Sequence, residues 1–98
     1  MSSPSLFRQT VVVDLENGLH LVPCSQIAQL ARRHEGEFRV RNGDKIVDAK
    51  NVLDLMTLRA ECGTTLELEA QGSGAEQFLL ALVQLFNTRF ENSPSPAS

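Results

Sequence analysis

The sequence NGLHLVP at residues 17–23 marks the point where a loop passes into a helix, and the rest of the fold can be worked out from it. A turn at Gly18 leads to His20, and Pro23 follows at the start of an apolar pattern with helical spacing. Proline suits the first turn of a helix because the amide hydrogen it lacks would have no intrahelical partner there. We therefore expect His20 at or beside the N-cap of a helix.

The start of a helix is a place where a phosphate can be held. Its first backbone amides have no partner within the helix, and the aligned peptide dipoles make this end partly positive. A phosphoryl group on His20 would lie near the amides of Leu21 and Val22, whereas Pro23 offers none. A second interpretation is equally open from position alone, namely that His20 only caps the helix.

Apolar periodicity on both sides of this stretch predicts four strands and three helices. Residues 7–14 place odd- and even-numbered side chains on opposite faces and contain a β-branched run that favours a strand. After Pro23 the helical spacing continues until Gly36, a residue that favours a helix end. The remaining expected elements are strands at 37–41, 45–48 and 64–70, a short helix after Asn51, and a last helix at 75–90.

Turn and capping residues sharpen this outline. Asn42-Gly43 is a strong hairpin signal, because a type I′ turn needs two residues at positive φ. Asn51 is placed to cap the short helix, with Asp54 at its third position as in a capping box. Glu67 and Glu69 alternate with apolar residues in the last strand, so we expect them on a solvated face.

The order βαββαβα with one antiparallel hairpin indicates an α+β fold, with helices on one face of a sheet. Residues 7–91 are expected to form a single domain, a size at which one core suffices. We expect a flexible leader at 1–6 and a disordered tail rich in serine and proline at 92–98.

Composition narrows the classes of function. The net charge is −3 with mixed signs, and Trp and Tyr are absent, which argues against a nucleic-acid binder. No apolar run approaches the roughly 20 residues of a membrane span, and the first residues lack the pattern of a signal peptide. We therefore expect a cytoplasmic protein that neither inserts into membranes nor binds nucleic acid. We also expect it to be a monomer.

Taken together, these features resemble the histidine-containing phosphocarrier protein (HPr) family of the phosphoenolpyruvate-dependent sugar phosphotransferase system. The resemblance covers roughly residues 8–90 and implies an open-faced β-sandwich, a four-stranded antiparallel sheet with three helices on one face. The motifs that carry it are NGLH at 17–20, Pro23, NG at 42–43, DAK at 48–50, LMTL at 55–58, Gly63-Thr64 and Gly72.

The resemblance implies a function for the opening stretch. In the family, the histidine that matches His20 accepts a phosphoryl group on Nδ1 from enzyme I and passes it to a sugar-permease subunit. His20 would then be the phosphoryl acceptor, with Asn17 orienting its imidazole, and the chain would be a carrier without a cofactor rather than a stand-alone enzyme. A neutral imidazole is a competent nucleophile near pH 7.

The sequence departs from the family at two positions. Val22 stands where the family has an arginine, which steadies the phosphoryl group through charge-assisted hydrogen bonds. Phosphoryl transfer depends on such electrostatics, so we expect transfer with reduced efficiency. Lys50 and Arg32 are the expected nearby cations, although neither is a positional substitute. Asn51 replaces a serine that is phosphorylated in many members, so that form of control is not expected.

The resemblance also implies a docking face beside the histidine. Exposed apolar clusters on small domains more often mark binding sites than arise by chance, and the alternative is that part of this one is simply core of the short helix. An alternative function follows, a non-catalytic HPr-like regulatory or protein-binding domain. The residues assigned to this docking face are Leu21, Val22, Val52, Leu53 and Met56.

The two cysteines leave further alternatives. His20 and Cys24 are four residues apart and could form half of a metal site, but His34 and Cys62 lack the spacing to complete it, so we expect no metal. Cys24 could have a lowered thiol pKa near a helix start, or it could be a small buried residue, which is the favoured interpretation.

Overall fold

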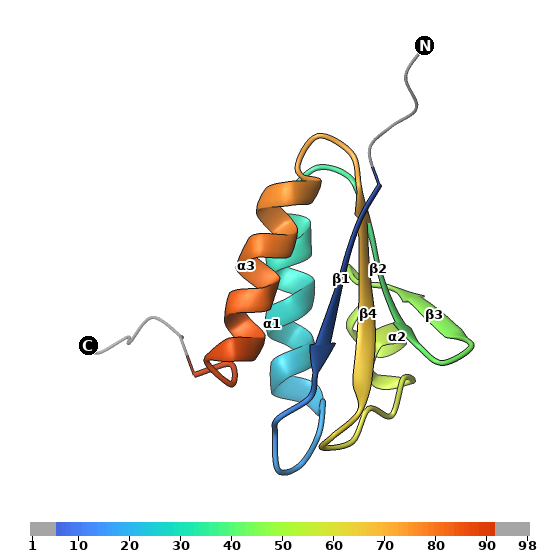
Figure 1. The fold of residues 1–98 in the computed structure, drawn as a ribbon, viewed down its shortest axis with the longest axis vertical. Helices are drawn as coiled ribbons and strands as arrows, with labels where there is room; N and C mark the ends of the chain where they lie inside the picture. The colour runs from blue at the N-terminus through green and yellow to red at the C-terminus, as the bar shows by residue number, and fades with distance from the viewer. Residues whose placement is uncertain (1–5, 92–98) are drawn as a thin grey trace.

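The computed structural model of the chain describes residues 6–91 and contains seven elements in the order βαββαβα (Figure 1). The strands are β1 (Leu6–Val12), β2 (Glu37–Asn42), β3 (Lys45–Asp48) and β4 (Thr65–Gln71), and the helices are α1 (Leu21–Arg32), α2 (Val52–Met56) and α3 (Ala75–Asn87). The strands form one sheet in the order β1-β4-β2-β3, and each neighbouring pair is antiparallel. The predicted α+β architecture is confirmed.

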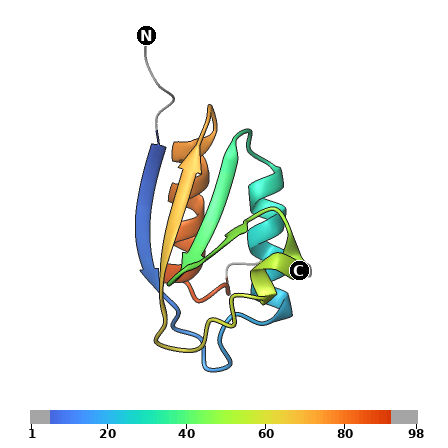
Figure 2. The same cartoon turned by 90° about the vertical axis from the view of Figure 1, so that its right-hand side faces the viewer.

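The helices cover one face of the sheet and leave the other open (Figures 1 and 2). α1 and α3 lie side by side against the sheet, and α2 packs on α1 and on the edge strand β3. The core lies between the layers, where Phe38 of β2 stacks on Phe78 of α3 with ring centroids 4.1 Å apart. The strand period of two buries Phe38 and Val40 while Glu37 and Arg39 face solvent.

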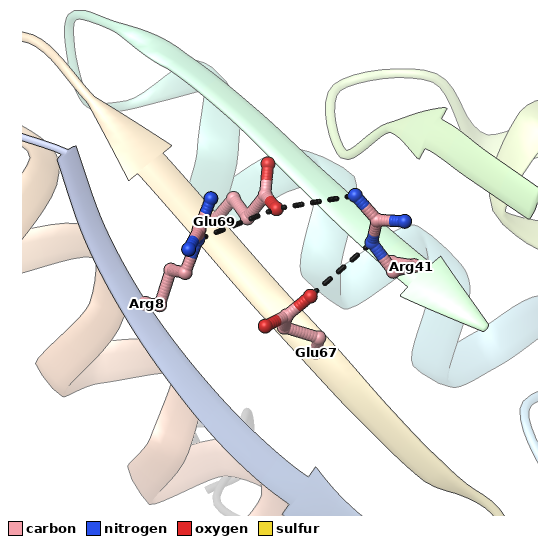
Figure 3. Close-up of polar contacts among 4 residues, drawn as sticks. All are labelled: Arg8, Arg41, Glu67 and Glu69. Atoms are coloured by element: carbon pink, nitrogen blue, oxygen red, sulfur yellow. Dashed lines mark ion pairs between the residues drawn. The ribbon is translucent and has the colours of Figure 1, made fainter. Parts of the chain in front are cut away.

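The open face of the sheet carries a network of paired charges (Figure 3). Glu69 of β4 lies between Arg8 of β1 and Arg41 of β2, and a guanidinium nitrogen of each arginine is 3.6 Å from Glu69 Oε2. Arg41 Nε is also 3.2 Å from Glu67 Oε1. These side chains meet because the register pairs Arg8 with Glu69 and Arg41 with Glu67. Glu69 is only 8% exposed, so the expectation of a fully solvated carboxylate is wrong there.

The β2–β3 hairpin forms where it was predicted, but with a different turn. Asn42 pairs with Lys45, so the two loop residues are Gly43 and Asp44. Of these two, Gly43 alone has a positive φ, at +64°. This fits a type II′ turn, which needs glycine at its first central position, rather than the predicted type I′. Asn42 therefore stays in β2, where its side-chain amide donates to the Leu58 carbonyl at 3.0 Å.

α2 begins at the predicted cap. The Asn51 side-chain oxygen accepts from the Asp54 amide at 3.1 Å. The reciprocal half of a capping box is replaced, since the Asn51 amide donates to the Asp48 carbonyl at 3.1 Å. A cap on one side is enough to start this single turn of helix.

α3 ends at Asn87, three residues before the predicted end. Arg89 and Phe90 have φ of +57° and +59°, which no helix residue adopts. The Phe90 amide donates to the Leu85 carbonyl at 2.7 Å, and its ring packs edge to face on Phe86. Burial of Phe90 is thus achieved by a reversal of the chain instead of a further helical turn.

β1 also differs slightly from the prediction. Leu6, which was assigned to the leader, is the first residue of the strand. Val13 lies beyond the strand end, yet it continues the pairing, because its amide donates to the Thr64 carbonyl at 2.8 Å and its carbonyl accepts from Gly63 at 2.7 Å. The rest of the predicted leader and the predicted tail at 92–98 lie outside the described residues.

Candidate functional site

His20 is the N-cap residue of α1, as the sequence predicts. Its backbone is extended, and its carbonyl accepts the first helical hydrogen bond from the Cys24 amide at 3.1 Å. The imidazole is exposed and makes no capping hydrogen bond. The side chain therefore does not act as the helix cap, because it accepts no hydrogen bond from the first-turn amides of Leu21 and Val22.

The loop before His20 is held against the segment that follows α2. The Leu19 amide donates to the Ala60 carbonyl at 2.8 Å, and the Leu19 side chain is buried. Gly18 has a φ of +71°, and a Cβ atom there would lie 2.5 Å from the Ala60 oxygen. Only glycine allows this conformation and this close approach together. The position of His20 is thus fixed by a contact between two loops that are distant in sequence.

This contact also connects the two motifs that stood out in the sequence. The Asn42 side-chain amide donates a hydrogen bond to the Leu58 carbonyl. Two residues later, the Ala60 carbonyl accepts a hydrogen bond from the Leu19 amide. The hairpin end and the loop before His20 are therefore tied to the same short segment, residues 58–60. Sequence reasoning missed this segment, because only the apolar Leu58 carried a signal.

Pro23 and Cys24 anchor the first turn of α1 in the core. Both are buried, and Pro23 occupies the third helical position, where no amide hydrogen is required. Burial raises the pKa of the Cys24 thiol from 9.0 to about 11. The alternative of a reactive Cys24 with a lowered pKa is therefore wrong, because burial of the thiol disfavours its charged form.

Asn17, the predicted orienting group, lies in the turn three residues before His20 and is exposed. Within residues 6–91, its side chain makes no hydrogen bond to His20. Its orienting role remains a prediction from the resemblance.

The two cations expected near His20 lie elsewhere. Arg32 is the last residue of α1, and eleven helical steps of 1.5 Å place its backbone roughly 16 Å from Leu21. The Lys50 ammonium donates to the Gly36 carbonyl at 2.9 Å and lies over the Phe38 ring, which places it near the same C-terminal end of α1. Neither side chain can replace an arginine in the first turn.

The residues of the predicted docking face are mostly exposed. Leu21, Val22, Leu53 and Met56 reach solvent, with Leu53 at 74%, whereas Val52 is half-buried and packs against the core. α2 is in contact with α1, and Figure 2 shows it beside the N-terminal half of that helix. The two halves of this apolar surface thus come from adjacent helices.

The cysteines and histidines do not gather into a metal centre in the part of the chain that the structure describes. No group of three or more His, Cys, Asp or Glu side chains is arranged to hold a metal ion among residues 6–91. In the same range, no helix is long and apolar enough to cross a membrane.

The fold and the site together define an open-faced α+β sandwich with an exposed histidine at the first turn of a helix. Over residues 7–88 the chain matches the model of a family described as the PTS HPr component phosphorylation site. The chain therefore belongs to the HPr family of phosphocarriers of the phosphotransferase system, and the resemblance found in the sequence is confirmed.

Individual relatives agree with this assignment. Phosphocarrier protein HPr of Pseudomonas aeruginosa is 37% identical over 75 residues, which cover 76% of this chain and 83% of the relative. Phosphocarrier protein NPr of Escherichia coli K12 is 31% identical over 85 residues, or 86% of this chain and 94% of the relative. A crystal structure of HPr-C-His from Thermoanaerobacter tengcongensis aligns with a TM-score of 0.83 at 27% identity and covers 90% of this chain and 99% of that one.

Proposed function

We propose that this protein is a cytoplasmic, monomeric phosphocarrier that accepts a phosphoryl group on His20 from an enzyme I-like donor and passes it to a sugar-permease subunit or a regulatory partner. The observation that carries the proposal is the exposed His20 imidazole, which is not used as a helix cap although it stands at the N-cap of α1. Membership in a family of phosphocarriers supports the same conclusion.

The chemistry needs only groups of this chain and the donor. The lone pair of the unprotonated imidazole nitrogen attacks phosphorus, and the bond between phosphorus and the donor's leaving atom breaks with its electron pair on the donor. The amides of Leu21 and Val22 and the dipole of α1 stabilise the added negative charge. Transfer to the next protein is the same exchange in reverse, with His20 as the leaving group.

Partner recognition is assigned to the apolar surface of Leu21, Val22, Leu53 and Met56, with Val52 beneath it. These side chains are exposed on two helices that contact each other. A partner that covers this surface would exclude water from the reacting phosphoryl group and strengthen its electrostatic stabilisation. Docking and transfer would therefore use the same end of the molecule.

The direct test incubates the full chain with phosphoenolpyruvate and enzyme I from its own organism. We expect an acid-labile phosphate on His20, detected by ³¹P NMR, and its complete loss in His20→Ala. Because His20 is exposed, the variant should unfold at the same temperature as the wild type. Absence of phosphate on the wild-type chain would reject the proposal.

The alternative is a regulatory domain that binds a partner without phosphoryl transfer. Val22 favours it, because the first turn of α1 carries an exposed valine where the resemblance predicts an arginine. Val22→Arg separates the two functions: a weakened phosphocarrier should be phosphorylated about tenfold faster by the added cation. For the regulatory domain, the variant would remain unphosphorylated, and partner binding would be insensitive to His20→Ala.

A further inference from the structure

Arg59 stands out because its backbone is held in an unusual conformation. Its φ is +49°, a left-handed geometry that L-residues other than Asn and Asp adopt rarely and at a cost. The carbonyls on either side are both fixed, Leu58 by the Asn42 side chain and Ala60 by the Leu19 amide. Such strained residues are retained where the surrounding structure determines them, and they concentrate at functional sites.

The same contacts bring Arg59 close to His20. The Ala60 carbonyl, one residue after Arg59, bonds to the amide of Leu19, one residue before His20. The loops are in tight contact, since a Cβ on Gly18 would also come within 3.0 Å of Glu61 Cα. The guanidinium and the imidazole thus extend from backbones that are each one residue from a shared hydrogen bond.

Arg59 is also the cation left available by the rest of the described chain. The chain has nine Lys and Arg residues, and Arg59 forms no ion pair with a carboxylate in residues 6–91. Arg32 and Arg33 lie at the opposite end of α1, and Lys45 lines a surface hollow with Asp44 and Asp54. The others are held by partners: Arg8 and Arg41 on the open face, Arg39 by Glu37, Arg89 by Asp14, and Lys50 by the Gly36 carbonyl.

The first turn of α1 needs such a cation from elsewhere. Its own side chains, Leu21, Val22 and Pro23, are all apolar, so backbone amides are its only donors. A phosphoryl group carries about two negative charges near pH 7, more than two amides neutralise. A guanidinium binds phosphate oxygens with two parallel N–H groups, a geometry that lysine cannot offer.

We propose that Arg59 is the phosphate-binding cation of this site, whose guanidinium binds the phosphoryl oxygens on His20 from the segment after α2. This inference rests on the proposed function of His20 as a phosphoryl acceptor. The positive charge would then come from a different segment of the chain than the histidine. The hydrogen bond between Leu19 and Ala60 would hold the backbones of Arg59 and His20 near each other.

The test uses phosphoramidate, a small donor that requires no partner protein. Its P–N bond breaks, ammonia leaves, and a new P–N bond forms on the His20 imidazole. We expect Arg59→Gln to form phosphohistidine about tenfold more slowly than the wild type and Arg59→Lys to recover part of the rate. Arg33→Gln is the matched control, an equal change of charge at the far end of α1, and should react at the wild-type rate.

Arg59→Gly separates chemistry from folding. Glycine accepts the positive φ, so this variant should unfold at or above the wild-type temperature and yet lose the same tenfold in rate. Wild-type rates in Arg59→Gln and Arg59→Gly, or an equal loss in Arg33→Gln, would overturn the role of Arg59.

A parallel reaction with enzyme I and phosphoenolpyruvate distinguishes the two proposals. If enzyme I fails on the wild type while the phosphoramidate rates still depend on Arg59, the carrier function is rejected and the site of Arg59 stands. If enzyme I phosphorylates the wild type, Arg59→Gln and Arg59→Gly equally fast, the role of Arg59 is rejected and the carrier function stands. A wild-type chain that accepts phosphate from neither donor overturns both.

Discussion

On the open face of the sheet, Arg8, Arg41, Glu67 and Glu69 pair with one another across three strands, whereas the start of α1 presents groups that have no hydrogen-bond partner among residues 6–91. The register of adjacent strands fixes the charge pairs, so that even Glu69 is nearly buried among them. At the start of α1 the His20 imidazole and the side chains of Leu21 and Val22 are exposed to solvent. Groups that satisfy each other stabilise a fold, while groups left unsatisfied are available to a ligand or a partner.

The supports of the two regions differ in the same way. The open face follows from the pairing of neighbouring strands, which involves many hydrogen bonds. The His20 end rests on fewer supports, the buried Pro23 and Cys24 and a contact between two loops, where Gly18 and Leu19 meet Ala60. A single substitution should therefore disturb the His20 end far more than the open face.

The largest effect should come from Gly18→Ala. The new methyl group meets the Ala60 carbonyl in a backbone conformation unfavourable to alanine, so we expect a loss of about 3 kcal/mol in unfolding free energy. Phosphorylation of His20 should fall with it. Gly43→Ala is the matched control, because Gly43 has a similar φ but open space around it, and should lose about 1 kcal/mol. If urea denaturation shows the same loss of unfolding free energy in Gly18→Ala and Gly43→Ala, the loop contact is not important for stability.

The next effect concerns the core beneath the His20 end and depends on pH. Burial raises the pKa of Cys24 to about 11, so the folded chain keeps the thiol proton to a higher pH than the unfolded chain. This contribution to stability is complete below pH 9 and is lost as the pH rises from about 9 to about 11, a fall of roughly 2–3 kcal/mol.

The measurement compares unfolding free energies between pH 8 and pH 11. Cys24→Ala should lack this part of the decline, whereas Cys62→Ala should keep it, because Cys62 is exposed. If the curves of wild type and Cys24→Ala run parallel throughout, the thiol is not desolvated as described.

A smaller effect should separate docking from folding. Leu53→Asp places a charge in the proposed partner surface and should weaken binding of the phosphoryl donor about thirtyfold, or roughly 2 kcal/mol. Leu80→Asp is the control, since Leu80 on α3 is comparably exposed, at 67%, and lies outside that surface. If titration calorimetry finds that both variants bind the donor with equal affinity, α2 does not belong to the partner surface.

The smallest effect should come from the open face. Glu69→Gln breaks the ion pairs with Arg8 and Arg41. Because ion pairs with partly exposed arginines contribute little, we expect the unfolding free energy, measured by thermal unfolding, to fall by about 1 kcal/mol. Phosphorylation should not change. A change in its rate would mean that the two regions are coupled through the sheet, and the contrast between them would no longer hold.

Much of the fold could be predicted because the signals are local. Alternation predicted the buried faces of β1, β2 and β4, Pro23 predicted the first turn of α1, and Asn51 predicted the start of α2. The errors fall where a local rule met a competing contact. α3 stops early because Phe90 is buried by a reversal of the chain, and the hairpin turn changes type because Asn42 stays in its strand.

The sequence by itself determined the element order, the family, and the position of His20 at the start of a helix, because strand alternation, capping and proline geometry act over a few residues. Only the tertiary structure decided what surrounds that histidine. Cys24 is buried, and its pKa is raised as a result. Arg32 and Lys50 lie at the far end of α1 from His20. The backbone of Arg59 lies next to the hydrogen bond that joins Ala60 to Leu19. Those outcomes depend on which distant segments pack together, and a pattern read along the chain carries no information on that.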